Sequence, residues 1–125
     1  MIDLDITRIL ALRLAAQYPG VYVGSPLAPD SIVLPAILLE IDSDVVVGSS
    51  LQRANLKVSV QSSADDSTAD AHAMFARSVD VFLRAQTINE GGLYMWQPVP
   101  ARTSNAVGDR HWETSIEYVL GLEAL

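Results

Sequence analysis

Cysteine is absent from this chain of 125 residues. Its absence excludes disulfides, thiolate nucleophiles and sulfur-ligated metal sites, and it is compatible with a reducing compartment. Aromatic residues are also scarce, at 6 %, although half of the residues are apolar. That composition argues against a disordered chain and predicts a core of valine, isoleucine, leucine and alanine side chains.

Positive charge is in short supply as well. Eight Lys and Arg residues, only one of them lysine, stand against fifteen Asp and Glu residues, for a net charge of -7. Proteins that hold nucleic acid tightly neutralise phosphates with basic side chains, so the charge argues against tight DNA binding. An acidic surface past which DNA slides without sticking remains compatible with it.

Long apolar runs are missing. The most apolar segment, residues 32–41, is interrupted by Pro35 and is shorter than the roughly 20 residues of a membrane-spanning helix. Residues 1–5 lack the basic segment of a signal peptide. We therefore expect no membrane association and no processing.

The length fits one domain, residues 1–125, with two helices. The first helix is predicted over residues 4–17, before Pro19 and Gly20. It is apolar on two sides, with Ile6 on one side and Leu4 and Ala11 on nearly the opposite side. Either these two residues meet a second neighbour, such as another subunit, or they are exposed small apolar residues.

The second helix is predicted over residues 67–86. Its expected buried stripe consists of Ala71, Met74, Phe75, Ser78, Phe82 and Ala85. Arg77, Asp80 and Arg84 share the opposite side at spacings of three and four, which is typical of a solvated, ion-paired face.

The remaining periodic segments predict strands. Residues 36–41 are apolar on both sides, as in an inner strand covered on both faces. Residues 56–61 and 111–120 alternate between apolar and polar positions, as on a sheet with one wet face. Residues 93–102 and 110–122 are predicted as two antiparallel strands joined by a loop over 104–109, and the predicted fold is α+β. It has a mixed, mainly antiparallel sheet and two helices in the order α-β-β-α-β-β.

Two connections carry further hypotheses. Residues 19–35 contain four prolines and are predicted to form a proline-rich arm, in which residues 21–23 pair as an edge strand away from the main sheet. Residues 42–53 form either a hairpin tip or a protruding loop. There, Val45, Val46 and Val47 either extend a strand or meet a partner.

The penultimate strand contains Pro98 and Pro100. Proline donates no ladder hydrogen bond, so this strand is expected at a sheet edge or bent out of the sheet. Its aromatic residues Tyr94 and Trp96 are expected to cluster with Trp112 and Tyr118, as packing first and as a ligand platform second.

No residue cluster has the form of a catalytic signature. Glu40, Asp42 and Asp44 alternate as ligands of a hard cation would, but nothing completes a calcium loop, so a solvated strand end is the prediction. The two histidines, His72 and His111, stand on different elements, which argues against zinc. We therefore predict no metal, no cofactor and no enzymatic activity.

The whole pattern resembles a known family. An N-terminal helix precedes the apolar strand Pro-Ala-Ile-Leu-Leu-Glu-Ile at 35–41. The strand Leu-Lys-Val-Ser-Val at 56–60 then leads through Asp65 and Asp66 into a long helix, and the chain closes with Arg-His-Trp-Glu-Thr-Ser-Ile-Glu-Tyr at 110–118. This arrangement resembles the tail terminator and neck (head-tail joining) proteins of tailed bacteriophages and related prophages.

The resemblance implies a structural virion protein of the tail-neck region that assembles in the bacterial host cytoplasm. Such a protein forms a homo-oligomeric ring, expected to be a hexamer, at the head-proximal end of the tail tube. It ends tail polymerisation and docks the head. Its implied partners are the major tail tube protein and a head connector or stopper protein, and DNA would pass through the lumen without specific binding.

The residues expected at subunit or tube contacts are Leu4, Ala11, Pro26, Leu27, Pro29, Asp42, Asp44, Val45, Val46, Val47 and Arg53. Of these, Asp42, Asp44 and Arg53 are placed near the tube or lumen surface. Two alternatives stay open. One is another neck component, such as a head-tail joining or stopper protein, and the other is a small α+β ligand-binding or enzymatic domain with a pocket under Trp96 and Trp112.

Overall fold

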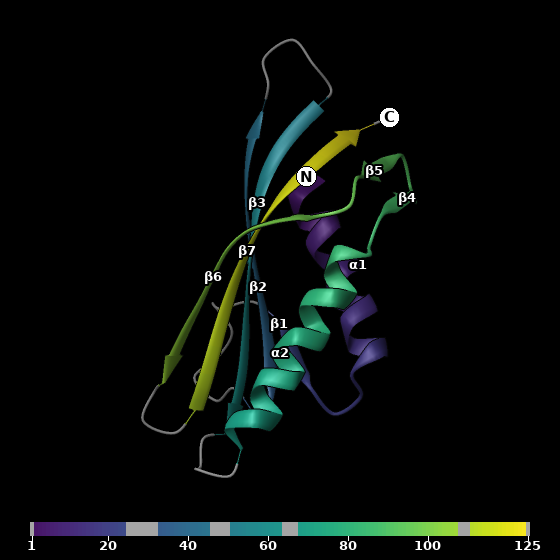
Figure 1. Cartoon of the computed structure of the whole chain (residues 1–125). Coiled ribbons are helices and arrows are strands. Elements are labelled where there is room, and N and C mark those ends of the chain that lie inside the picture. Colours follow the sequence, from purple (N-terminus) through teal and green to yellow (C-terminus); the bar gives the residue numbers. More distant parts are fainter. Residues whose placement is uncertain (1, 25–32, 46–50, 64–67, 108–110, 125) are drawn as a thin grey trace.

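The computed structural model describes residues 2–24, 33–45, 51–63, 68–107 and 111–124. Two helices and seven strands follow one another in this part of the chain (Figure 1). The helices are α1 (Ile2–Gln17) and α2 (Ala69–Arg84). The strands are β1 (Tyr22–Gly24), β2 (Ala36–Val45), β3 (Leu51–Ser63), β4 (Ile88–Glu90), β5 (Leu93–Met95), β6 (Val99–Val107) and β7 (His111–Ala124).

The fold-class prediction is wrong. The order is not α-β-β-α-β-β, and the described residues are dominated by one seven-stranded mixed sheet. Strand β4 escaped the sequence analysis because its three residues carry no readable period. The segment predicted as one strand over residues 93–102 is two strands, β5 and β6, and β6 continues to Val107 where a loop was expected.

The sheet is organised around β7. Along one edge, β7 pairs antiparallel with β3 from His111 to Glu123. Along its other edge, β7 pairs first with β6 and then with β5. The order across the sheet is β1-β2-β3-β7-β5-β4, with β6 beside β7 (Figure 1).

The proline-rich segment joins this same sheet. Strand β1 pairs in parallel with β2, from Tyr22 opposite Ala36 to Gly24 opposite Leu38. The edge strand predicted at residues 21–23 is therefore part of the main sheet, and its expected separation from that sheet is wrong. The neighbouring edge of β2 offers the backbone partners that a short strand needs.

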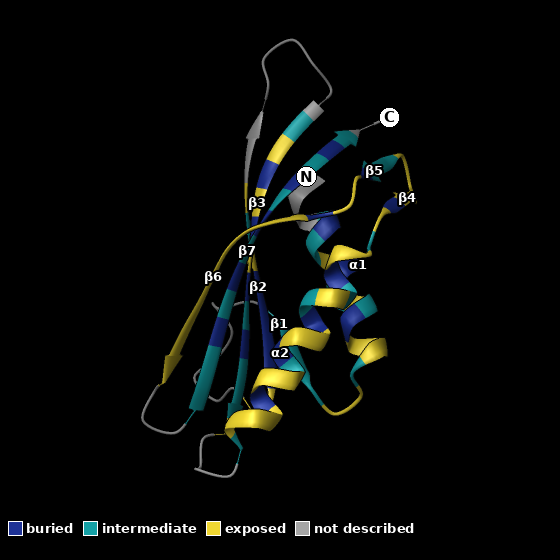
Figure 2. Cartoon of the chain, viewed as in Figure 1, coloured by how far each residue is buried: buried dark blue, intermediate teal, exposed yellow. Residues whose placement is uncertain are grey.

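The alternation in β3 and β7 is confirmed, because every second residue is buried. The inner face of the sheet, toward α1 and α2, carries Leu56, Val58 and Val60 of β3 and Thr114, Ile116, Tyr118 and Leu120 of β7. Residues between them, such as Lys57 and Glu117, lie on the opposite face, which we call the outer face. Figure 2 shows this striped burial and the exposed surfaces of both helices.

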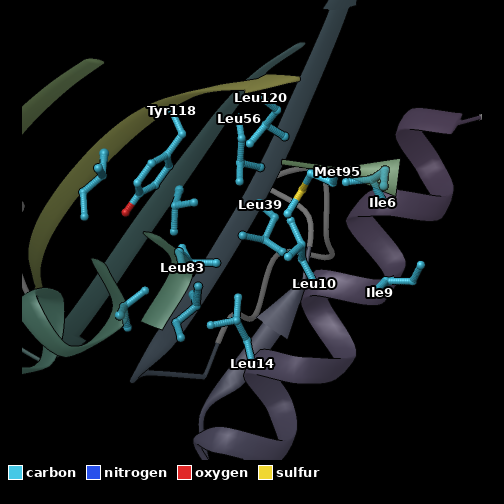
Figure 3. Packing of buried hydrophobic residues seen from close by; sticks show 14 of the residues in the cluster. Ile6, Ile9, Leu10, Leu14, Leu39, Leu56, Leu83, Met95, Tyr118 and Leu120 are labelled. Carbon is cyan, nitrogen blue, oxygen red and sulfur yellow. The ribbon is translucent and has the colours of Figure 1, made fainter. Parts of the chain in front are cut away.

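The core lies between the inner face and the two helices. Ile6, Leu10 and Leu14 of α1 are fully buried, and they belong to one cluster with Leu39 of β2 and Met95 of β5 (Figure 3). Leu83 of α2 and Tyr118 and Leu120 of β7 belong to the same cluster (Figure 3). The core is mainly aliphatic, as the scarcity of aromatic residues predicts.

The predicted buried stripe of α2 is wrong by roughly one residue. The buried residues are His72, Ala76, Val79 and Leu83, whereas Met74 is 73 % exposed. Phe75 and Phe82 flank the buried stripe and pack edge-on against Tyr18, with ring centroids 5.6 and 6.2 Å away. The aromatic side chains therefore fill the space toward Tyr18, while smaller residues meet the sheet.

This rotation brings Asp80 toward the core instead of solvent. The Tyr118 hydroxyl donates to Asp80 Oδ1 at 2.6 Å, and Arg84 Nη2 lies 3.0 Å from Asp80 Oδ2. Burial, together with the hydrogen bond to Asp80, raises the pKa of Tyr118. The bond joins α2 to the centre of β7, and it satisfies a hydroxyl that would otherwise be buried without a partner.

We expect Asp80→Ala to lower the free energy of unfolding by about 1–3 kcal/mol, because it leaves the buried Tyr118 hydroxyl unsatisfied. The matched control Arg84→Ala removes only a partly exposed ion pair and is expected to cost less than about 1 kcal/mol. Urea unfolding of both variants measures the difference. Equal losses would contradict a special role for the Tyr118 hydrogen bond.

Candidate interaction surface

The outer face carries a row of alternating charge across four strands. Glu40 of β2 lies opposite Lys57 of β3. On the other side of β3, Lys57 lies opposite Glu117 of β7, and Glu117 in turn lies opposite Arg102 of β6. Opposite charges on neighbouring strands stabilise such a sheet by about 0.2–1 kcal/mol a pair, so the row also favours this strand register.

Three predicted contact residues lie on or beside this face. Asp42 is exposed on β2, next along that strand to Glu40 on the same side. Asp44 and Arg53 are direct cross-strand partners in the β2–β3 ladder, which reaches Val45 opposite Gln52. The hairpin thus brings together the acidic and basic positions that the sequence analysis placed near a tube or lumen surface.

These acidic residues are spread along the strand among polar and basic partners. Asp42 lies opposite Asn55, and Glu40 opposite Lys57. Among the described residues, no group of three or more His, Asp or Glu side chains is placed to hold a metal ion. A hollow of about 460 Å³ on this face is lined by Asp42, Lys57 and Glu117, among others, so the face is polar and of mixed sign.

Strand β6 is the most exposed element of the sheet. All nine of its residues are exposed, including Val99 at 61 % and Val107 at 67 % (Figure 2). Among the described residues, β6 pairs only with β7, so its other edge is free. The edge position predicted from Pro98 and Pro100 is confirmed.

Only the first part of β6 has the features that normally protect an edge. Pro100 lacks an N–H group, and the pairing with β7 is irregular between Pro100 and Arg102. From Ala101 to Val107 there is no proline and one charged residue, Arg102. This second part offers unpaired backbone groups to another strand.

The aromatic cluster predicted from sequence is not formed. Tyr94 and Trp96 do meet, with ring centroids 4.6 Å apart. The backbone N–H of Trp96 donates to the Gly121 carbonyl at 3.1 Å, and a Cβ on Gly121 would lie 3.1 Å from the Trp96 ring. Glycine at 121 therefore leaves room for the indole to lie against β7.

Trp112 and Tyr118 lie elsewhere. Tyr118 is buried on the inner face, and Trp112 Nε1 donates to Thr68 Oγ1 before α2. Trp112 is nine residues from Gly121 along β7, which is about 30 Å in an extended strand. A pocket between Trp96 and Trp112, on which the ligand-binding alternative depended, is therefore not formed.

A partly buried hydrogen-bond chain lies behind β6. His72 Nδ1 is 2.8 Å from Ser62 Oγ, and His72 Nε2 is 2.9 Å from Thr114 Oγ1. The Thr114 hydroxyl donates to Asn105 Oδ1 at 2.8 Å, so it accepts from Nε2–H of His72. The Ser62 hydroxyl then donates to Nδ1, and the chain joins β3, α2, β7 and β6.

The sequence analysis missed this role of His72, which it considered only as a zinc ligand. Burial lowers the pKa of His72 below its usual value. The neutral ring fits the chain because it donates at Nε2 and accepts at Nδ1. The sequence showed a histidine on an amphipathic helix, but its partners Ser62 and Thr114 lie on other elements, so only the fold reveals them.

The other predicted contact residues have different outcomes. Leu4 and Ala11 both belong to α1, and Ala11 is partly buried against the protein's own core. Val45 ends β2. Pro26, Leu27, Pro29, Val46 and Val47 lie outside the described residues. No helix among the described residues is long and apolar enough to cross a membrane.

Comparison with known proteins identifies the fold and nothing finer. No family model matches the sequence, and no curated protein matches it. Several solved structures are similar. One of them, a protein whose name carries no functional information, superposes with a TM-score of 0.60 at 15 % identity, covering 94 % of this chain and 90 % of its own. The chain thus has a fold that occurs in known structures.

The His72 chain predicts a pH dependence of stability. His72 binds its proton more weakly in the folded protein than in the unfolded chain, so its contribution is complete above about pH 6.5 and is lost as the pH falls below that value. We expect the free energy of unfolding to fall between about pH 7 and pH 5, and to fall less in His72→Gln.

Urea unfolding at several pH values measures this dependence. The matched control is His111→Gln, which leaves the His72 chain intact and is expected to keep the wild-type dependence. An unchanged dependence in His72→Gln would contradict the assignment.

Proposed function

We propose that this protein is a structural virion component that assembles into a ring at the head-proximal end of a bacteriophage tail tube. The ring ends tail polymerisation and offers the surface to which the head docks. Six copies are the expected number, and DNA passes through the central hole. The proposal follows the family resemblance in the sequence and is supported by the exposed edge of β6.

The edge of β6 is the observation that carries the proposal. A nine-residue edge strand with every residue exposed is a site at which chains associate, and isolated proteins usually protect such an edge. Here the protection by proline ends at Pro100, and Ala101 to Val107 remains available. A protein built to contact copies of itself accounts for this exposed strand.

The charge of the molecule agrees with DNA passing by without binding. The net charge is -7, and the lysine and arginine side chains of the outer face alternate with acidic ones in the ladder around Lys57. A surface of this kind offers no continuous basic patch to the phosphates of DNA. The second candidate, a head-tail joining or stopper protein, shares these features and differs in its place in the neck.

Assembly is tested by light scattering after size exclusion, over a range of concentrations, with negative-stain images of the same fractions. We expect rings with a central hole and a mass near six times the 13.5 kDa of one chain. A compact closed dimer would contradict the proposal.

An aspartate placed on the free edge should prevent assembly, because a charged edge residue discourages strand pairing and adds negative charge to an already acidic protein. We expect Ser104→Asp on β6 to move the protein from rings to monomers. Ser59→Asp is the matched control, because Ser59 lies in the same cross-strand row on β3, which has a neighbour on both sides. Rings from both variants would exclude the β6 edge from the contact.

A further inference from the structure

Among the residues that the structure describes, the sheet has a second free edge, on β2, whose length matches the unprotected part of β6. Strand β1 covers β2 only from Ala36 to Leu38. Among the described residues, nothing pairs with the same edge of β2 from Leu39 to Val45, which is seven residues. The unprotected part of β6, from Ala101 to Val107, is also seven residues.

The directions of the strands favour a junction between these two edges. Strands β2, β3, β7 and β6 lie side by side, and each is antiparallel to the next. Strand β6 is therefore antiparallel to β2. If β6 of one copy pairs antiparallel with β2 of a second copy, the sheet continues and both copies keep the same orientation. Such a head-to-tail contact, repeated, builds rings or filaments.

The two edges are complementary in charge. Arg102 is the one charged residue of β6. The free part of β2 contains Glu40, Asp42 and Asp44, and Glu40 and Asp42 are exposed on the outer face. Arg102 lies on that same face, opposite Glu117. Joining the edges with matching faces brings the basic end of one copy to the acidic end of the next.

The faces and the lengths together select one register. Arg102, Ser104 and Ala106 belong to the outer face, as do the positions of Glu40, Asp42 and Asp44. Pairing all seven residues of each edge sets Ser104 opposite Asp42 and Arg102 opposite Asp44. On the inner face, Val107, which is 67 % exposed, then lies beside Leu39 and gains apolar cover.

We propose that Ala101–Val107 of one copy pairs antiparallel with Leu39–Val45 of the next copy, so that the sheet runs continuously from subunit to subunit. This inference rests on the proposed ring and names the contact that would build it. The partner at each edge is a second copy of this chain.

The absence of cysteine allows a direct test by engineered disulfides. Residues directly opposite each other on antiparallel strands have Cβ atoms about 4.5–5.5 Å apart, close enough for a disulfide after small adjustments. We expect the double variant Ser104→Cys, Asp42→Cys to form a ladder of covalent oligomers on a non-reducing gel after mild oxidation. A mixture of the two single variants should give covalent dimers and nothing larger.

Two control variants and one folding measurement accompany this test. Ser104→Cys alone should stay monomeric on the gel, because a covalent dimer would mean that β6 pairs with β6 across a two-fold axis. Thr103→Cys with Asp42→Cys should not cross-link, because Thr103 lies opposite Ile116 on the inner face. Melting temperatures near that of the wild type show that each variant is folded.

The possible outcomes separate the junction from the function. The junction is supported if, among all the variants, only Ser104→Cys with Asp42→Cys forms a ladder of covalent oligomers. No ladder, a dimer from Ser104→Cys alone, or equal cross-linking through Thr103→Cys overturns it, even if the wild type forms rings. If light scattering shows no assembly of the wild type at any concentration, the proposed ring fails as well.

Discussion

The pairing of β7 along both of its edges is the constraint on which the rest of the structure depends. One edge holds β3 over thirteen residue pairs, and the other holds β6 and then β5. Alternate residues of β7 form the floor of the core, where Tyr118 meets Asp80 of α2. A shift of one residue in this strand would turn that floor toward solvent.

The same strand decides where the interaction surface lies. Because β5 occupies the end of β7 near Ala124, β6 is left alone beside the other half, with its second edge free among the described residues. The hydrogen-bond chain from Ser62 through His72 and Thr114 reaches Asn105 on the inner side of β6. An exposed strand is thus held from behind by a partly buried polar chain, which restricts the shape of its edge.

Local patterns predicted several elements correctly. The alternation of β3 and β7, the position of α1 and the edge location of the Pro98–Pro100 segment all follow from the geometry of single elements. The fold class failed because the three residues of β4 have no pattern of their own, and because only pairing with β2 shows that β1 belongs to the main sheet. The buried side of α2 failed for a related reason, since apolar residues lie on two adjacent sides and only packing against Tyr18 and the sheet chooses between them.

The sequence by itself determined the composition of the core, the excess of negative charge, the two helices and the alternating strands, because each depends on residues that are close together in the chain. It also placed Asp42, Asp44 and Arg53 in one segment, predicted as a hairpin tip or a protruding loop, since residues 42–53 are contiguous. Only the tertiary structure decided that Glu40, Lys57, Glu117 and Arg102 form one row and that His72 reaches Asn105. These contacts join residues far apart in sequence, so they exist only once strand order and register are set.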